Sequence, residues 1–344
     1  MSAGATAPLT PPTLAEIRAA RDRIAGVALR TPLVRLDRRA GEPEIWLKLE
    51  NLQPIGSFKI RGAASAIALA PREALARGVY TASAGNMAQG VAWCARAAGV
   101  PCTVVVPDTA PRAKLDAIER LGARLVPVPF ERWWRVLVER RYDDLEGLFV
   151  HPVSDPAVIA GNATIGLEIV EDLPGIAAVL VPFGGGGLSC GIASALCASG
   201  ASAPTFACEV DTAAPLAAAL AAGGPRQIEY QASFVDGISA RSVLDEMWPL
   251  AAGLLAGSCV VTLEEVAGAI RTLVSRARVV PEGAGAVSLA AALAGRAARG
   301  AAGAIVPIPQ GPLVCVISGG NIDPAKLATL LEGRLPYAKR AATG

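Results

Sequence analysis

Short runs of valine, isoleucine and leucine alternate with alanine-rich segments of helical length along most of this 344-residue chain. Strands that are apolar throughout and joined by helices are typical of parallel sheets covered by helices on both faces. The sequence therefore predicts an α/β fold. We expect helices at 87–98 and 111–121, and strands at 79–83, 102–107, 124–128, 178–182 and 314–318.

Composition excludes several classes of protein. Apolar and aromatic residues make up 52% of the chain and charged residues 18%, so the chain can form a core and is not a disordered protein. The 32 Lys and Arg residues against 30 Asp and Glu leave a net charge of +2, without the basic surplus that a nucleic-acid-binding protein needs. The seven cysteines include no CxxC pair, so neither a disulfide framework nor a structural zinc site is expected.

Neither a membrane span nor a signal peptide is expected. The stretch 175–205 has no charged residue, but it contains Pro182, Pro204 and four consecutive glycines, which favours a buried strand, a loop and a buried helix. Residues 1–12 are small and polar without an apolar core. We therefore expect a cytoplasmic protein that does not contact a membrane.

Irregular stretches at 54–62 and 153–156 flank a compact strand–helix series. We interpret that series as a small domain, residues 55–156, inserted into a large domain formed by residues 1–54 and 157–344. An inserted domain of this kind predicts an active site in the crevice between the two sheets.

Two glycine-containing segments carry candidate chemistry. GSFKIRGA (56–63) is a turn followed by a helix start, with Lys59 in the first turn, where the helix macrodipole lowers the pKa of an amine. A Schiff-base lysine needs such a pKa, although a surface lysine would show the same local pattern. Four consecutive glycines lie between an apolar strand and a helix: Gly184, Gly185, Gly186 and Gly187. This context favours a site where backbone N–H groups bind a phosphate over a plain flexible turn.

Two serine-containing segments, SAGNMAQG (83–90) and SGGN (318–321), also lie at the ends of predicted strands. Ser83 and Asn86 supply short hydrogen-bonding groups at a helix N-terminus, although a simple helix cap explains that segment equally well and a turn explains the second. Together, the four segments offer one candidate Schiff-base lysine and one phosphate cradle. They indicate a phosphorylated aldehyde cofactor.

The segments GSFKIRGA, SAGNMAQG, PFGGGGLSCG and ISGGNID, in this order, resemble those of the fold-type-II pyridoxal-phosphate enzymes, and most of all the threonine/serine dehydratase branch. The resemblance extends from about residue 15 to 331. It implies a fold like that of tryptophan synthase β, with two domains that each have a mostly parallel sheet flanked by helices. It also implies a homodimer, pyridoxal 5'-phosphate as the cofactor, a small amino acid as the substrate and no metal ion.

By this resemblance, Lys59 binds the cofactor covalently and later accepts the α-proton of the substrate, while Phe58 packs beside the cofactor ring. Asn86 hydrogen-bonds the ring hydroxyl and Ser318 faces the pyridine nitrogen. The four-glycine segment binds the phosphate together with Leu188. The residues assigned to the substrate are Ser83, whose hydroxyl binds the carboxylate, Ala84, Gly85, Met87 and Gly237.

Several positions modify these expectations. Met87 stands where the family has histidine, which is explained either by drift or by a pocket for a larger group on Cβ, such as the ring of phenylserine. Ala84 replaces the serine that protonates the substrate in racemase relatives, so little racemase activity is expected. Glu209 is expected to be structural, since Pro215 replaces the second carboxylate of a cation site in those relatives. Glu282 matches a glutamate near the cofactor ring.

The activity implied by the resemblance is that of a dehydratase, or ammonia-lyase, which eliminates water from a β-hydroxy-α-amino acid and releases a 2-oxo acid and ammonia. A racemase, a β-replacement enzyme related to cysteine synthase, and a non-catalytic ligand-binding protein are the alternatives. The only histidine, His151, is expected to form hydrogen bonds at the domain boundary. Trp133 and Trp134 are expected on a helix face or an interface, or in a wall of the substrate pocket.

Overall fold

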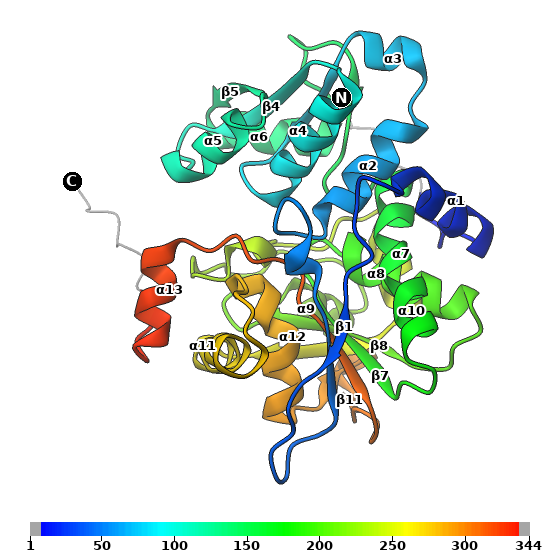
Figure 1. The fold of residues 1–344 in the computed structure, drawn as a ribbon, viewed down its shortest axis with the longest axis vertical. Helices are drawn as coiled ribbons and strands as arrows, with labels where there is room; N and C mark the ends of the chain where they lie inside the picture. The colour runs from blue at the N-terminus through cyan, green and yellow to red at the C-terminus, as the bar shows by residue number, and fades with distance from the viewer. Residues whose placement is uncertain (1–7, 337–344) are drawn as a thin grey trace.

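The computed structural model describes residues 8–336 and contains two sheets, one in each of two stacked parts of the molecule (Figure 1). The upper sheet in Figure 1 has four parallel strands in the order β5-β4-β3-β6. All four lie within the predicted insert 55–156, whose end residues stay a prediction. Their bounds are Val79–Ala82 (β3), Cys102–Pro107 (β4), Arg124–Val128 (β5) and Leu148–Phe149 (β6).

The lower sheet has eight strands in the order β1-β2-β12-β7-β8-β9-β10-β11. Its five central strands, from β2 to β9, are parallel, while the pairs β1–β2, β9–β10 and β10–β11 are antiparallel. The bounds are Leu33–Arg35 (β1), Ile45–Lys48 (β2), Ala178–Pro182 (β7), Thr205–Val210 (β8), Leu255–Val261 (β9), Ala298–Arg299 (β10), Ile305–Val306 (β11) and Leu313–Val316 (β12).

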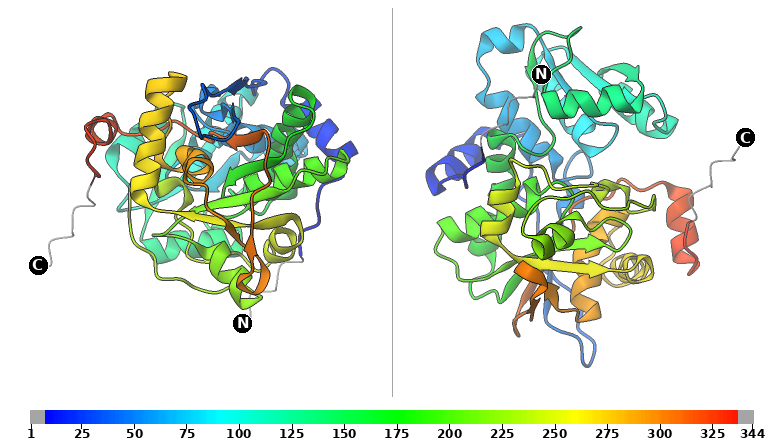
Figure 2. Two further views of the ribbon diagram at one scale, coloured as in Figure 1. Left: turned by 90° about the horizontal axis from the view of Figure 1, so that it is seen from below. Right: turned by 180° about the vertical axis from the view of Figure 1, so that it is seen from behind.

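Helices surround both sheets (Figure 2). Those near the upper sheet are Arg72–Ala76 (α3), Asn86–Ala98 (α4), Arg112–Glu119 (α5) and Phe130–Glu139 (α6). The others are Leu14–Ile24 (α1), Lys59–Leu69 (α2), Pro156–Asp172 (α7), Gly187–Ala198 (α8), Pro215–Ala222 (α9), Trp248–Leu254 (α10), Leu263–Thr272 (α11), Gly283–Ala294 (α12) and Pro324–Leu331 (α13). Short helical turns are Glu50–Leu52 (η1), Asp236–Ile238 (η2), Leu273–Ala277 (η3) and Ala301–Gly303 (η4). No helix within residues 8–336 is both long and apolar enough to cross a bilayer.

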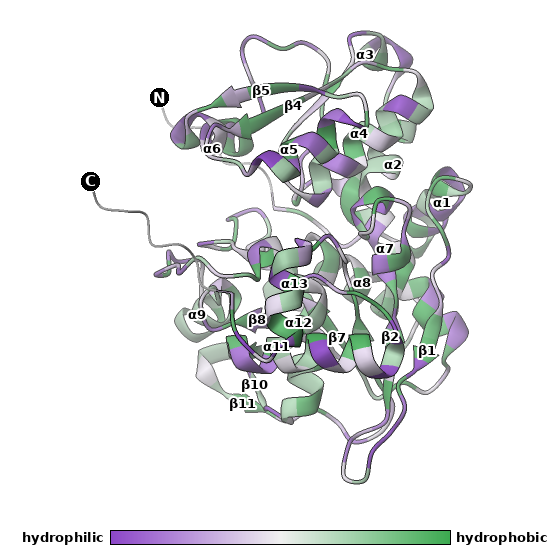
Figure 3. Cartoon of the chain, turned by 60° about the vertical axis from the view of Figure 1, so that its left-hand side comes forward, coloured by the Kyte–Doolittle hydropathy of each residue, from purple (hydrophilic) through white to green (hydrophobic). Residues whose placement is uncertain are grey.

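Strands β7 and β12, at the centre of the lower sheet, are buried on both faces, as their continuous apolar sequence predicts; Figure 3 gives the hydropathy along the chain. Successive side chains of a strand point to opposite faces. Leu180 packs in one core cluster with residues of α11 and α12, whereas Val179 and Val181 pack in another with residues of α7 and α8. The α/β fold class is therefore confirmed.

The bounds of β4, β5 and β7 agree with the predicted strands, and those of the other predicted elements differ by a few residues. Strand β12 ends at Val316 instead of residue 318, because the carbonyl oxygen of Ser318 bonds to Phe58 outside the sheet. Helix α6 carries the two tryptophans. Trp133 packs against the core of the upper part, whereas Trp134 is 42% exposed.

Candidate active site

Lys59 is the first residue of α2, and the segment before it is bonded to the chain that follows β12. The N–H of Phe58 donates to the carbonyl oxygen of Ser318 at 3.0 Å, and Ser57 forms an isolated antiparallel bridge with Gly319. Two of the four predicted segments, far apart in the sequence, are therefore side by side.

Lys59 is half-buried, and its amine is hydrogen-bonded within the protein. Its Nζ donates to the carbonyl oxygen of Pro152 at 2.7 Å and lies 5.1 Å from the centre of the Phe58 ring. Burial lowers the pKa of Lys59 to about 8, against the charge of Glu282, which raises it. Roughly one amine in ten is then neutral at pH 7, as a nucleophile or a base requires.

The four glycines connect β7 to α8, and the chain at residues 152–153 approaches them closely. A Cβ atom on Gly185 would lie 2.6 Å from the Val153 side chain, and one on Gly187 would lie 2.6 Å from the Val153 carbonyl oxygen. Gly186 has a φ of 95°, which L side chains rarely adopt. Only glycine fits these positions, and the N–H groups at the start of α8, where Leu188 is buried, remain available for an anion.

Asn86 begins α4 and is bonded on both sides. Its Nδ2 donates to Oε1 of Glu282 at 2.8 Å, and its Oδ1 accepts from Nδ2 of Asn321 at 2.8 Å. Burial raises the pKa of Glu282 to about 7, and the charge of Asp236 raises it further, while the bond from Asn86 lowers it. The third and fourth segments therefore meet at one buried carboxyl group.

The residues predicted to bind the substrate have different surroundings. Ser83, Ala84 and Gly85 are half-buried, and the Ser83 hydroxyl accepts from the N–H of Gly85 at 3.2 Å. Gly237 is exposed, and a Cβ atom there would lie 3.4 Å from Glu282 Oε1. In contrast, Met87 is 2% exposed and packs in the apolar core of the upper part. Its contact with a substrate stays a prediction.

Sequence reasoning missed a buried ion cluster around Arg61, two residues after Lys59 in α2. The guanidinium of Arg61 donates to Glu50 Oε2 at 2.8 Å and to Glu168 Oε1 at 2.6 Å, and Lys48 Nζ donates to Glu168 Oε2 at 2.6 Å. All four charged side chains are at most 5% exposed. The signal in the sequence was an arginine, Arg61, among the mostly apolar residues of α2 that follow Lys59, but its partners lie outside this helix.

Glu209 has the geometry of a structural residue. It is fully buried, and its carboxylate accepts from the N–H groups of Leu216 and Ala217 at the start of α9 and from the Ser258 hydroxyl. Burial raises its pKa to about 7 against these bonds. The part of the chain described by the structure has no group of three acidic, histidine or cysteine side chains placed to hold a metal ion.

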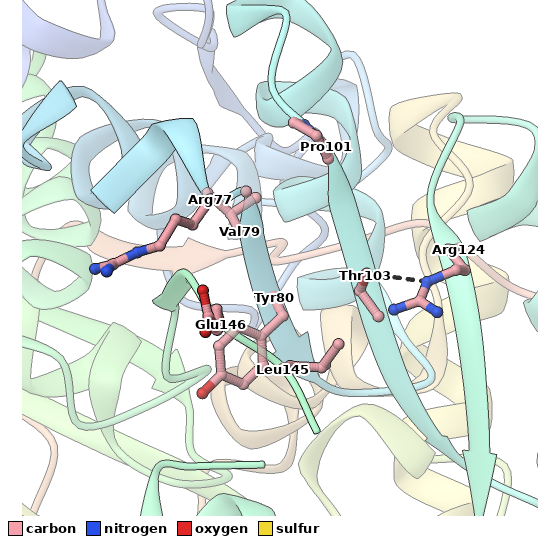
Figure 4. Close-up of a pocket in the computed structure, with 9 residues that line it drawn as sticks. Arg77, Val79, Tyr80, Pro101, Thr103, Arg124, Leu145 and Glu146 are labelled. Atoms are coloured by element: carbon pink, nitrogen blue, oxygen red, sulfur yellow. Dashed lines mark hydrogen bonds between the residues drawn. The ribbon is translucent and has the colours of Figure 1, made fainter. Parts of the chain in front are cut away.

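A separate cavity of about 340 Å³ lies where β3 and β4 begin (Figure 4). None of the predicted site residues lines it. Arg77 and Arg124 lie on opposite sides of it in Figure 4, and they do not converge on one point. It is therefore distinct from the site around Lys59.

The residues around Lys59 fit pyridoxal phosphate. An amine with a lowered pKa suits the aldehyde. The backbone N–H groups at the start of α8, in a loop where Val153 leaves no room for Cβ atoms on Gly185 and Gly187, suit the phosphate. A family model described as "Pyridoxal-phosphate dependent enzyme" matches residues 24–318. The chain belongs to this family, and it is a pyridoxal-phosphate-dependent lyase.

Relatives with assigned activities cover nearly the whole chain. The L-threonine ammonia-lyase of Geobacter sulfurreducens is 40% identical over 94% of this chain and 79% of its own length. The structure of maize serine racemase superposes with a TM-score of 0.83 at 29% identity, covering 94% of this chain and 98% of its own. The processed threonine deaminase isoform 2 of Solanum lycopersicum gives 0.81 at 29% identity, covering 95% and 96%.

Proposed function

We propose that this protein is a dehydratase that eliminates water from threonine or serine and releases a 2-oxo acid and ammonia. The observation that carries the proposal is the position of Lys59, whose amine donates to the Pro152 carbonyl oxygen and whose preceding residues are bonded to the SGGN segment of residues 318–321. The likeness to an L-threonine ammonia-lyase over most of both chains supports this substrate class.

When bound, pyridoxal phosphate supplies an electron-withdrawing ring that makes the α-proton of an attached amino acid acidic. Lys59 is the base for this proton, because its lowered pKa leaves part of it neutral near pH 7. The electron pair of the broken C–H bond forms the Cα–Cβ double bond as the Cβ–O bond breaks. The leaving hydroxyl takes up one proton, and this proton balances the α-proton transferred to Lys59, so one water is lost overall. Hydrolysis of the released enamine then gives the 2-oxo acid and ammonia.

The remaining site residues hold the reactants in place. The glycine loop and Leu188 bind the phosphate, and Ser83 with the N-terminus of α4 binds the substrate carboxylate. Ser318, which is 3% exposed, would be the partner of the pyridine nitrogen. A neutral hydroxyl does not keep that nitrogen protonated, so it favours loss of a β-leaving group over a long-lived carbanion.

The test is a panel of serine, threonine and phenylserine, each followed for ammonia and for the 2-oxo acid. We expect turnover of serine or threonine with equal amounts of both products. A panel that gives no ammonia, but gives product only when a thiol is added, would instead identify a β-replacement enzyme.

Racemisation is the second candidate, because a serine racemase shares this fold over nearly its whole length. Ala84, on the segment that leads into α4, has no proton to donate to Cα. We therefore expect elimination to be much faster than inversion. Deuterium incorporation at Cα of recovered, inverted serine, at a rate near that of ammonia release, would favour the racemase.

The preference for a larger substrate, predicted from Met87, is the finer part of the proposal. Its thioether lies in the apolar core of the upper part, so it acts on a ring at Cβ only through the residues packed around it. We expect kcat/KM for phenylserine relative to threonine to fall several-fold in Met87→His. An unchanged ratio leaves threonine and serine as the substrates.

A further inference from the structure

The glycine loop is held by two residues from different parts of the chain. Val153 contacts the positions that Cβ atoms on Gly185 and Gly187 would occupy. Met247, just before α10, brings its Cε within 3.1 Å of the corresponding position on Gly186. The shape of the loop therefore depends on where Val153 and Met247 lie.

The neighbours of these two residues are bonded to each other. The Ser154 hydroxyl donates to Oε1 of Glu246 at 2.9 Å. Arg140 donates to the same Glu246 oxygen at 3.1 Å, to the Ser154 hydroxyl at 2.6 Å and to the Ser154 carbonyl oxygen at 3.1 Å. One carboxylate thus joins the end of α6 to the two segments that hold the glycine loop.

The bonds among Arg140, Ser154 and Glu246 lie in a partly shielded part of the chain. Ser154 is fully buried, and the Arg140 and Glu246 side chains are 28% and 13% exposed, so solvent and salt screen the Arg140–Glu246 pair only partly. Arg140 ends α6 with a φ of 55°, a conformation that costs free energy for a residue with a Cβ atom. His151 fixes the turn, because its Nδ1 accepts from the N–H groups of Val153 and Ser154.

We propose that Glu246, with Arg140 and Ser154, is a positioning group that holds the phosphate cradle in its binding shape. Their side-chain hydrogen bonds run to one another, to the Ser154 carbonyl oxygen and to His151, so they act on the loop through the neighbouring Val153 and Met247. The inference rests on the assignment of the glycine loop as the phosphate site. The chemical class of ligand whose affinity they control is a phosphorylated pyridine aldehyde, through its phosphate.

The test compares the dissociation constants of pyridoxal 5'-phosphate and of pyridoxal, which lacks the phosphate, measured by equilibrium dialysis of the full chain. Glu246→Gln keeps the size of the side chain and removes its charge. We expect at least a tenfold rise in the constant for pyridoxal 5'-phosphate and less than a twofold change for pyridoxal. Arg140→Met gives a similar rise, and the double variant adds little to either, because the two residues act as a unit.

The matched control is the ion pair between Arg132, also on α6, and Asp144. Its side chains are 51% and 68% exposed. Arg132→Met and Asp144→Asn should leave both constants unchanged, with a melting temperature close to that of the unmodified protein, because exposed ion pairs contribute little stability. An unchanged constant in Glu246→Gln would overturn the proposal, as would an equal loss of affinity for both ligands. An unmodified protein that does not prefer pyridoxal 5'-phosphate to pyridoxal would instead refute the phosphate site itself.

Discussion

The amine of Lys59 has a single recorded hydrogen-bond acceptor within the described residues, the Pro152 carbonyl oxygen, and burial keeps its pKa near 8. Lys59→Ala should abolish ammonia release and the covalent fixation of cofactor by borohydride. The fold should persist, because the change removes a buried cation that makes no ion pair within 4 Å in the part described. Lys326→Ala, at an exposed lysine of α13, is the control. Cofactor fixed by borohydride in Lys59→Ala would contradict the assignment.

His151 makes stability depend on pH. Burial, with the charges of Arg140 and Lys59, lowers its pKa to about 3, whereas the unfolded chain binds the proton near pH 6.5. Stability is therefore fully present above pH 6.5 and is lost as the pH falls, by about 2 kcal/mol between pH 6.5 and 5. His151→Gln removes this contribution. In urea unfolding, the stability of the unmodified protein should approach that of the variant over this interval, and a constant difference would exclude His151 as the cause.

The start of helix α8 requires residues without a side chain. Gly187→Ala would place a Cβ atom 2.6 Å from the Val153 carbonyl oxygen. We expect a loss of about 1–3 kcal/mol of stability and weaker binding of pyridoxal phosphate, because the backbone must shift. Gly253→Ala in α10 meets nothing within 4 Å, so it should be neutral or stabilising by up to about 1 kcal/mol. Unfolding and cofactor titration of both variants measure the difference, and equal effects would argue against the close approach.

An ion cluster joins helix α2 to its neighbours: Arg61 pairs with Glu50 and Glu168, and Lys48 also pairs with Glu168. Arg61→Leu leaves two buried carboxylates with one cation, and removal of one partner from a buried ion pair costs about 3–5 kcal/mol. Arg21→Leu breaks an exposed pair with Glu171 and should cost about 1 kcal/mol or less. Urea unfolding distinguishes them. A loss below about 1 kcal/mol in Arg61→Leu would show that the cluster does not hold α2.

At the scale of the whole molecule, ion pairs join the upper and lower parts, such as Lys114 with Asp236 and Arg140 with Glu246.

The resemblance to fold-type-II enzymes implies a homodimer. Light scattering should therefore give twice the chain mass of 35.0 kDa at micromolar concentration. A mass of one chain over the whole concentration range would show that the predicted dimer does not form.

The α/β fold class, the strands β4, β5 and β7 and the glycine loop could be predicted from the sequence, because each depends on local physics. A continuous apolar run must be buried on both faces, and four glycines between a strand and a helix leave N–H groups free for an anion. Lys59 differs, because its segment alone also fits a surface lysine, and only the resemblance carried by all four segments together assigned its role.

Tertiary structure decided everything that depends on two distant segments meeting. The carboxylate partners of Arg61 come from η1 and α7, and Glu246 reaches Ser154 across more than ninety residues. Met87 shows the same limit, because the packing of α4 against its sheet turns that side chain into the core. Local sequence determines which groups are present and in which element they lie. The relative placement of those elements is set by the packing of the whole chain.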